Sequence, residues 1–254
     1  MFWNKKYKPT VTPEDKEWIE GELLFIKESL LDKNAFNELD IILPTKQYYN
    51  LEFNGTEENA RHILEQTKIF LNIDDENIKL KFVKNFSVKM DNRRILTSSS
   101  KDIYGTSNDY IGSYNNDNGE TTIYIENELL KSPYSLISTI AYELCYHILL
   151  SKEELEESNG YLTELFAIVY GFGIFIGNSR FSYSITKNSD LSTLHETSST
   201  GYLPEEVAAY AMAWLSVYRN ENTDWKKFLN KSMLKYFEQN IQYIENNRDK
   251  VAFE

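Results

Sequence analysis

The sequence predicts an α+β fold, with short strands in the first half of the chain and helices dominating the second half. Three observations support this class. Residues 78–83 alternate between apolar and polar side chains, as a half-buried strand does. Two further short segments, 110–114 and 121–125, flank a turn and read as a hairpin. Two longer apolar segments, 136–150 and 162–178, have the length of helices.

The sequence predicts two helices in the first 70 residues. Thr12 is a capping residue, Pro13 suits the first helical position, and apolar residues at helical spacing continue to residue 30. The turn at 54–58 leads into a second helix whose inward face lies within 60–70. The polar segment 84–109 has no clear period, so we expect a long loop or an irregular strand there.

Turn and capping residues also punctuate the second half. Asn118 and Gly119 both tolerate positive φ and form a strong hairpin signal. Ser132 and Pro133 open the first long apolar helix as cap and first residue. We expect an acidic surface stretch at 153–160 and a Ser/Thr-rich loop at 182–200. Leu203 and Pro204 open a helix that continues to 217, and Asp224 caps a last helix that continues to 244.

Length and patterning predict one integrated domain. Residues 1–150 form an α+β N-terminal part that includes the first apolar helix, and residues 151–254 form a helical C-terminal part. No linker separates the two parts, and no internal repeat is visible.

The composition limits which partners the protein can bind and in which cellular compartment we expect it. The net charge of −12 disfavours nucleic acid and anionic membranes, because both bind through Lys and Arg. The single cysteine, Cys145, cannot form an intrachain disulfide. No apolar segment follows the charged residues at the N-terminus, so we expect no signal peptide. The longest apolar run, 165–177, is too short to span a bilayer. We therefore expect a cytoplasmic protein.

The most informative segment is the apolar helix at 136–150. Zinc peptidases carry H-E-x-x-H on a helix, where two His at i and i+4 bind zinc and the Glu is the general base. Here the matching window is Tyr142-Glu143-Leu144-Cys145-Tyr146. The Glu is present and both His positions are Tyr. A phenol is a poor zinc ligand at neutral pH because it stays protonated to about pH 10.

Several motifs in order resemble a family of uncharacterised bacterial zincin-like proteins, over about residues 40–220. That family has an A-H-E-L-x-H-x-L-L helix, a T-D-L segment and a G-F-G-I-F-x-x-N-S segment. The matching residues in this chain are Leu43-Pro44-Thr45, Gly112-Ser113-Tyr114, Ile123-Tyr124-Ile125, Ala141 to Leu149, Thr163-Glu164-Leu165, Gly171 to Ser179 and Gly201 to Glu206.

The resemblance implies a zincin-like fold, with a small mixed sheet, an active-site-type helix and a second helix that supplies a further acid. By position, Tyr142 and Tyr146 stand where the family has zinc-binding His, Glu143 stands at the general base, and Glu164 stands at the acid of T-D-L. The acid expected just before it falls near Gly160, which cannot replace it. Zinc is expected for the family, but its ligands are absent here, so we expect no cofactor.

Two readings of these residues stay open. Glu143 is either a buried acid hydrogen-bonded to a Tyr hydroxyl or, with His147 and Glu164, part of a shifted metal site that would suit iron or manganese. His62 on a helix surface and His195 in a polar loop are expected to be solvated. The glycines between 171 and 177 do not have phosphate-loop spacing and suit close helix packing instead.

The sequence favours a catalytically inactive zincin-like pseudo-peptidase that binds a protein or peptide, as an inhibitor, adaptor or immunity-type protein. The strand at 121–125 would be the edge that pairs with an extended peptide. The alternatives are a metal-dependent hydrolase using Glu143, His147 and Glu164, and a structural relic whose function lies on the C-terminal helices. The oligomeric state is left open.

Overall fold

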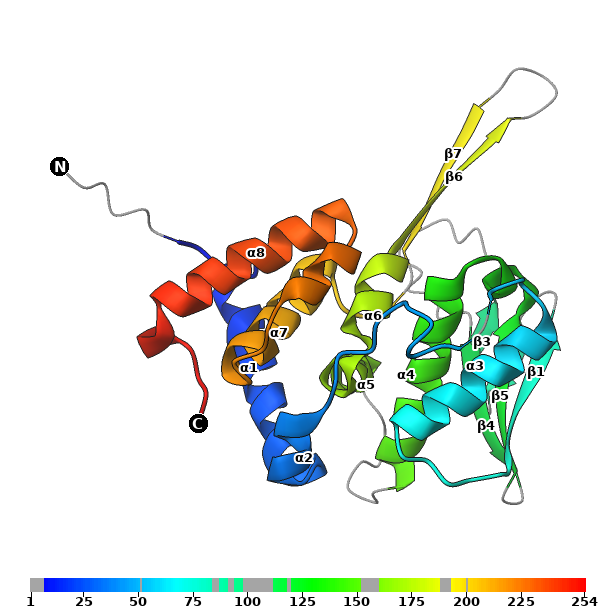
Figure 1. Cartoon of the computed structure of the whole chain (residues 1–254). Coiled ribbons are helices and arrows are strands. Elements are labelled where there is room, and N and C mark those ends of the chain that lie inside the picture. Colours follow the sequence, from blue (N-terminus) through cyan, green and yellow to red (C-terminus); the bar gives the residue numbers. More distant parts are fainter. Residues whose placement is uncertain are drawn as a thin grey trace.

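The fold mixes helix and strand and is mostly helical. The structure is a computed structural model that describes residues 7–50, 52–83, 87–90, 94–97, 112–117, 120–151, 160–187, 193–199 and 201–254. Figure 1 shows two neighbouring groups of elements: α3, α4 and the strands β1, β4 and β5 on one side, and α1, α2, α7 and α8 on the other, with α5 and α6 between them.

A small mixed sheet forms the β part, as expected. Its strands are β1 (Ile78–Val83), β5 (Glu120–Glu126) and β4 (Gly112–Asp117), in the order β1-β5-β4. β1 runs parallel to β5 and β4 runs antiparallel to it, so the predicted strand and hairpin are confirmed. The predicted turn residues, Asn118 and Gly119, lie outside the described residues.

One prediction about this sheet is wrong. The segment 121–125 belongs to β5, which pairs with β1 on one side and with β4 on the other. It is therefore the central strand and cannot accept a further chain. Its inward side chains Ile123 and Ile125 are fully buried. The hairpin pattern revealed only the β4 partner, because parallel pairing joins segments about forty residues apart.

The long apolar helix α4 (Pro133–Ser151) packs against this sheet. It also contacts α3 (Glu57–Phe70), and α3 in turn contacts β1. The predicted cap Ser132 is present, because its hydroxyl accepts from the N–H of Ser135. Thr56 also caps α3, with its hydroxyl accepting from the N–H of Asn59. A one-turn 3₁₀ helix at Asn127–Lys131 joins β5 to α4.

The helical part draws on both ends of the chain. Near the N-terminus lie α1 (Pro13–Phe25), capped by Thr12 as predicted, a π-helical turn (Ile26–Leu30) and α2 (Lys33–Glu38). These helices lie beside α7 (Glu205–Tyr218) and α8 (Lys231–Asn246) in Figure 1. The core of this part therefore combines residues that are almost two hundred positions apart.

The predicted helix at 162–178 is interrupted. It consists of α5 (Gly160–Ala167), a π-helical turn (Ile168–Phe172) and α6 (Gly173–Ser179). Gly171 has φ 91°, and a Cβ there would lie 2.0 Å from the carbonyl oxygen of Asp40. The N–H of Ile42 donates to the Gly171 carbonyl at 3.0 Å. The break thus admits the backbone of segment 40–42.

The other two glycines of this segment allow close packing, as expected. A Cβ on Gly173 would lie 3.0 Å from Met212 of α7, and one on Gly177 would lie 2.6 Å from Met233 of α8. The whole stretch Gly160–Ser179 is longer than the apolar run read from the sequence. It has the length and composition to cross a membrane, yet 83% of its apolar window is buried inside the protein, which is typical of a core helix.

Two further predictions are corrected. The expected loop at 182–200 contains β6 (Phe181–Lys187) and β7 (Thr193–Ser199), an antiparallel pair that extends away from the body after α6 (Figure 1). Asp224 begins only a 3₁₀ helix (Asp224–Phe228), and the cap of α8 is Asn230, whose side chain accepts from the N–H of Met233. A final 3₁₀ turn spans Arg248–Lys250.

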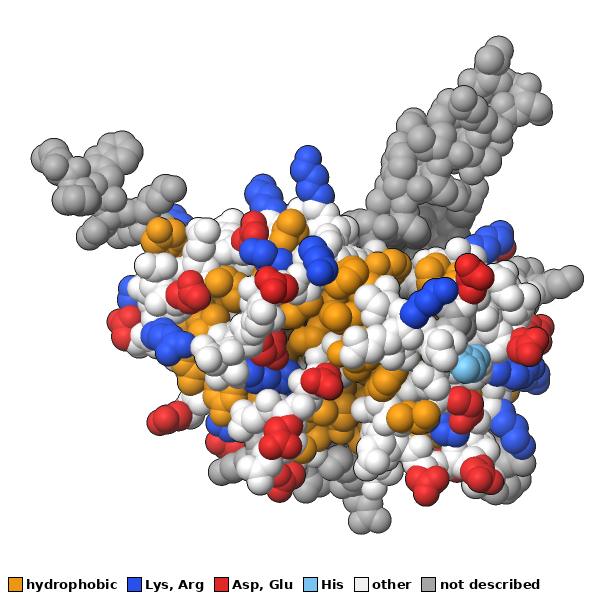
Figure 2. Space-filling model, in the orientation of Figure 1, with side chains coloured by type: hydrophobic (Ala, Val, Ile, Leu, Met, Phe, Trp, Pro, Cys, Tyr) orange, Lys and Arg blue, Asp and Glu red, His pale blue; other side chains and the backbone are white. Residues whose placement is uncertain are grey.

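For the polar segment at 84–109 we expected a loop or an irregular strand, and the part that the structure describes is strand. Its described residues form β2 (Ser87–Met90) and β3 (Arg94–Thr97), which pair antiparallel in a separate two-stranded sheet. The acidic stretch at 153–160 lies outside the described residues except for Gly160. Figure 2 shows acidic and basic side chains spread around the margin of one face, with hydrophobic side chains gathered in its middle.

Candidate functional site

Helix α4 places the zincin-like window inside the protein. Tyr142 and Glu143 are buried, with 6% and 3% of their surface exposed, whereas Tyr146 and His147 on the next turn are half-buried. The helix is apolar on nearly every side because it is covered by the sheet, α3, α5 and α6. The first half of this window is therefore part of the hydrophobic core.

Glu143 has an unusual titration. Burial removes its carboxylate from water and raises its pKa from 4.5 to about 8. A carboxyl group with this pKa is mostly protonated at neutral pH, so it is a poor general base there. Its negative charge, when present, raises the pKa of Tyr142 and of Tyr202, which places it close to both phenols.

Tyr142 packs against a residue from a distant loop. Its ring stacks on the ring of Tyr202, with centroids 5.7 Å apart and planes inclined by 23°. Burial is the largest cause of a raised pKa for Tyr142, and the neighbouring acids act in the same direction. The phenol therefore stays protonated throughout the physiological range and cannot serve as an anionic metal ligand.

Glu164 in α5 is held from three directions. Its Oε1 lies 2.7 Å from Nη2 of Arg180, and both side chains are almost fully buried. Its Oε2 accepts from the N–H groups of Tyr202 and Leu203, at 3.0 and 2.6 Å. Arg180 in turn donates to the carbonyl of Leu203. We call this set the Glu164 clamp, because it fixes the segment 201–203 against α5.

The structure does not assemble the shifted metal site. His147 faces Asp75, with Nε2 3.9 Å from Oδ2, and burial lowers its pKa against the opposing effect of that carboxylate. Both oxygens of Glu164 are engaged in the clamp. In the part of the chain that the structure describes, no three His, Cys, Asp or Glu residues are grouped to hold a metal ion.

The other two histidines lie elsewhere. His62 is exposed on α3, as expected, whereas His195 lies in β7 and not in a loop.

A pocket opens on the far side of Tyr202. Its volume is about 590 Å³. The described residues that line it are Asp15, Trp18, Tyr161, Gly201, Tyr202, Leu203, Pro204 and Val207. This set includes the Tyr that stacks on Tyr142, but neither Tyr142 nor Tyr146 itself. Tyr142 and Tyr146 lie one turn apart on α4, which predicts that their hydroxyls line one pocket together with Glu164, and this stays a prediction.

Sequence reasoning missed this pocket for a physical reason. Its walls come from α1, from the start of α5 and from the segment before α7, which are far apart in the chain. The partial signal was the aromatic pair Tyr161 and Tyr202 beside Gly160 and Gly201. A Cβ on Gly160 would lie 2.6 Å from the Tyr202 ring, so this glycine lets the ring lie flat on the helix start.

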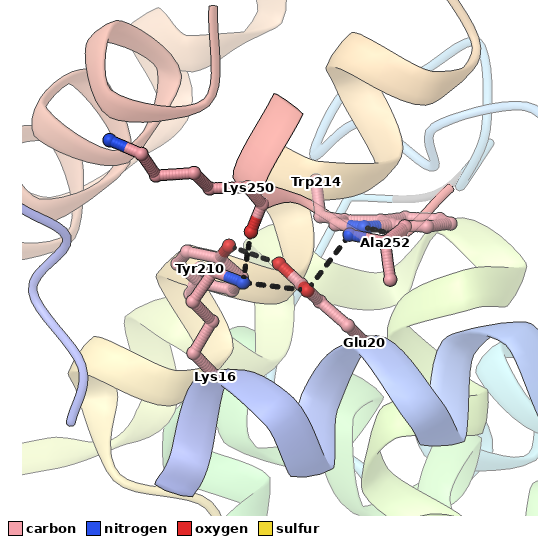
Figure 3. A network of polar contacts seen from close by, with 6 residues as sticks. All are labelled: Lys16, Glu20, Tyr210, Trp214, Lys250 and Ala252. Atoms are coloured by element: carbon pink, nitrogen blue, oxygen red, sulfur yellow. Dashed lines mark hydrogen bonds and ion pairs between the residues drawn. The ribbon is translucent and has the colours of Figure 1, made fainter. Parts of the chain in front are cut away.

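A second buried carboxylate organises the C-terminal segment (Figure 3). Oε1 of Glu20 accepts from the hydroxyl of Tyr210 at 2.6 Å, and Oε2 accepts from the N–H of Ala252 at 3.0 Å and from Lys16 at 2.8 Å. The indole N–H of Trp214 donates to the carbonyl of Ala252 at 3.0 Å. These contacts join α1, α7 and the chain end, so Glu20 has a structural role.

The residues at the zincin-like positions do not fit a zinc ion. They offer the protonated phenol of Tyr142, a carboxyl group with a pKa of about 8 and a carboxylate already paired with Arg180. Zinc requires deprotonated or neutral-imidazole ligands with free lone pairs. Comparison with known proteins finds no matching family model, no matching curated protein and no matching solved structure.

Proposed function

We propose that this chain is a pseudo-peptidase, a zincin-like scaffold that acts by binding a protein or peptide and not by hydrolysis. The observation that carries the proposal is that the side chains at three zincin-like positions are buried or bound within the protein itself. Tyr142 stacks on Tyr202, Glu143 is buried and mostly protonated, and Glu164 is locked in its clamp. A metal-activated water would need those side chains to be available, so hydrolysis is disfavoured.

The sheet supports a binding role through an edge strand. Among the described strands of this sheet, β1 and β4 each pair only with β5 and are both edges, and of the two β4 has the more extensive contact with α4, the helix that carries Glu143. An edge strand exposes backbone N–H and C=O groups that an extended peptide can satisfy by adding a strand. We therefore assign the peptide-accepting edge to β4 in place of the 121–125 strand. An inhibitor, adaptor or immunity-type protein would use this edge in the same way.

Restoring the missing ligands tests the scaffold. In the variant Tyr142→His/Tyr146→His, two imidazoles stand one turn apart beside Glu143, as in H-E-x-x-H. The matched control is Glu57→His/Arg61→His, the same i, i+4 pair on the exposed face of α3. We expect the 142/146 variant to retain zinc after desalting, measured by mass spectrometry, and to bind it more tightly than the control. Equal or weaker zinc binding would contradict a zincin-like arrangement.

The unmodified protein is the second part of this test. After incubation with Zn, Mn or Fe(II) and desalting, we expect no retained metal. Stoichiometric metal that is lost in His147→Ala would overturn the proposal and favour a metal-dependent hydrolase with the shifted Glu143, His147 and Glu164 site.

Proline substitutions test the edge. Backbone N–H groups alternate in direction along a strand, so of Asn115 and Asn116 one N–H points toward β5 and the other points away. Proline at the inward position should lower the melting temperature, while proline at the outward position should leave it unchanged. We expect the stable variant to lose binding to peptides selected from a random-sequence display library. Undiminished binding by that variant would refute strand addition at β4.

A further inference from the structure

The pocket beside Tyr202 is walled by three aromatic rings that meet at steep angles. The rings of Trp18 and Tyr161 are 6.2 Å apart with an interplanar angle of 80°, and those of Tyr161 and Tyr202 are 5.9 Å apart at 64°. At these steep angles the three rings form adjoining walls of the pocket, each pair in contact through the edge of one ring. Tyr161 remains 43% exposed, so the pocket is open to solvent.

One wall carries a negative charge. Asp15 is the only charged side chain among the described residues that line the pocket. Its carboxylate accepts from the hydroxyl of Thr12 at 2.9 Å, which is a neutral partner. The neighbouring Lys16 is engaged by Glu20 and by the Lys250 carbonyl. Among the described residues, no Lys or Arg forms an ion pair with Asp15 at the pocket.

The third ring is firmly positioned. Tyr202 rests on Gly160, stacks on Tyr142 and has its own N–H held by Glu164. A binding surface whose walls are already in place loses little conformational freedom when a ligand enters. The pocket is therefore pre-formed on the Tyr202 side.

We propose that this aromatic box, formed by Trp18, Tyr161, Tyr202 and Asp15, binds an alkylated ammonium ion. Aromatic faces attract a cation through their quadrupole, most strongly when the cation is poorly hydrated, and a carboxylate at the rim adds to the attraction. An anion is disfavoured by Asp15 and by the net charge of −12. A purely apolar ligand would gain nothing from the carboxylate.

This inference goes beyond the proposed peptide-binding edge and does not depend on it. The box is built by α1, α5 and the segment before α7, whereas the edge is β4. The cation has two possible sources with the same chemistry: a free small molecule, or a methylated lysine side chain in a protein. The experiment separates them.

Calorimetric titration of the full chain at constant ionic strength tests the proposal. The probes are choline chloride, a short peptide containing trimethyllysine, the same peptide with unmodified lysine, and 3,3-dimethylbutanol as the neutral isostere of choline. We expect choline, the trimethyllysine peptide or both to bind, and the neutral isostere to bind about tenfold more weakly than choline. Binding of choline alone identifies a small-molecule site, and tighter binding of the peptide identifies a protein ligand.

Matched variants locate the site. Tyr161→Ala and Asp15→Asn should each weaken binding of the preferred probe by about tenfold. Tyr7→Ala removes a similarly exposed Tyr outside the box, and Glu14→Gln removes the adjacent acid in the first turn of α1. Both controls should bind as the unmodified protein does. Unchanged melting temperatures establish that each variant is folded.

Three results would overturn the proposal. The first is no binding of either trimethylammonium probe at millimolar concentration. The second is equal binding of the neutral isostere, which would reveal an apolar site. The third is undiminished binding by folded Tyr161→Ala and Asp15→Asn, which would place the cation elsewhere.

Discussion

Burial of Glu143 should make the stability of this protein fall as the pH rises. The folded-state pKa is about 8, against 4.5 for an exposed carboxyl, so the folded protein holds a proton that the unfolded chain releases. The stabilising effect of that proton is complete below pH 4.5 and is lost as the pH rises through 8. At 1.36 kcal/mol for each pH unit, the loss is about 4 kcal/mol between pH 5 and pH 9.

Glu143→Gln isolates this effect, because the amide has nearly the same shape and does not titrate. The assay is urea unfolding of both proteins at pH 5, 7 and 9, from which the difference in free energy of unfolding is taken. We expect the variant to gain about 4 kcal/mol relative to the unmodified protein over that range. Cys145→Ala on the same helix is the control: because burial raises the pKa of its thiol, only the unfolded chain ionises there, and only near pH 9, so its effect should change by less than about 1 kcal/mol over the range. A constant difference for Glu143→Gln would refute the reasoning.

Three further substitutions test other parts of the structure. Arg180→Ala leaves the buried carboxylate of Glu164 without its cation and should lower the free energy of unfolding by about 3–5 kcal/mol in urea. Glu20→Ala removes the acceptor that holds the chain end, so carboxypeptidase should remove the last residues faster than in the unmodified protein; equal rates would contradict the role assigned to it. Gly171→Ala places a Cβ against the carbonyl of Asp40 at positive φ and should cost about 2 kcal/mol or more, whereas an unchanged melting temperature would show that the backbone can move.

The candidate site was only partly predictable. The pattern of α4 identified Tyr142, Glu143 and Tyr146, because a motif on one helix is a local feature. Glu164 was indicated only by the family resemblance, at the position of the acid in T-D-L. The partners that decide their chemistry, Arg180 and Tyr202, follow in a separate part of the chain, and their contacts depend on how that part returns to α5. No spacing rule predicts such a contact.

The strand predictions show the same division. Alternation predicted β1, and the hairpin signal predicted β4 and β5, because both patterns arise within a few residues. The pairing of β1 with β5 makes β5 central, which the local pattern did not reveal. β6 and β7 were missed because their Ser- and Thr-rich sequence is typical of loops, although Thr also favours strands.

The sequence by itself determined the α+β class, the caps at Thr12 and Ser132, and the loss of both imidazoles from the zincin-like window. These follow from residue identity and from periods of two or 3.6 residues, which act over one or two turns. Only the tertiary structure decided the burial of Glu143, the clamp on Glu164 and the aromatic box. Each depends on burial and on contacts between residues far apart in the sequence. The pKa of Glu143, for example, is raised because the surrounding core removes its carboxyl group from water, and the residues next to it in the sequence do not reveal this burial.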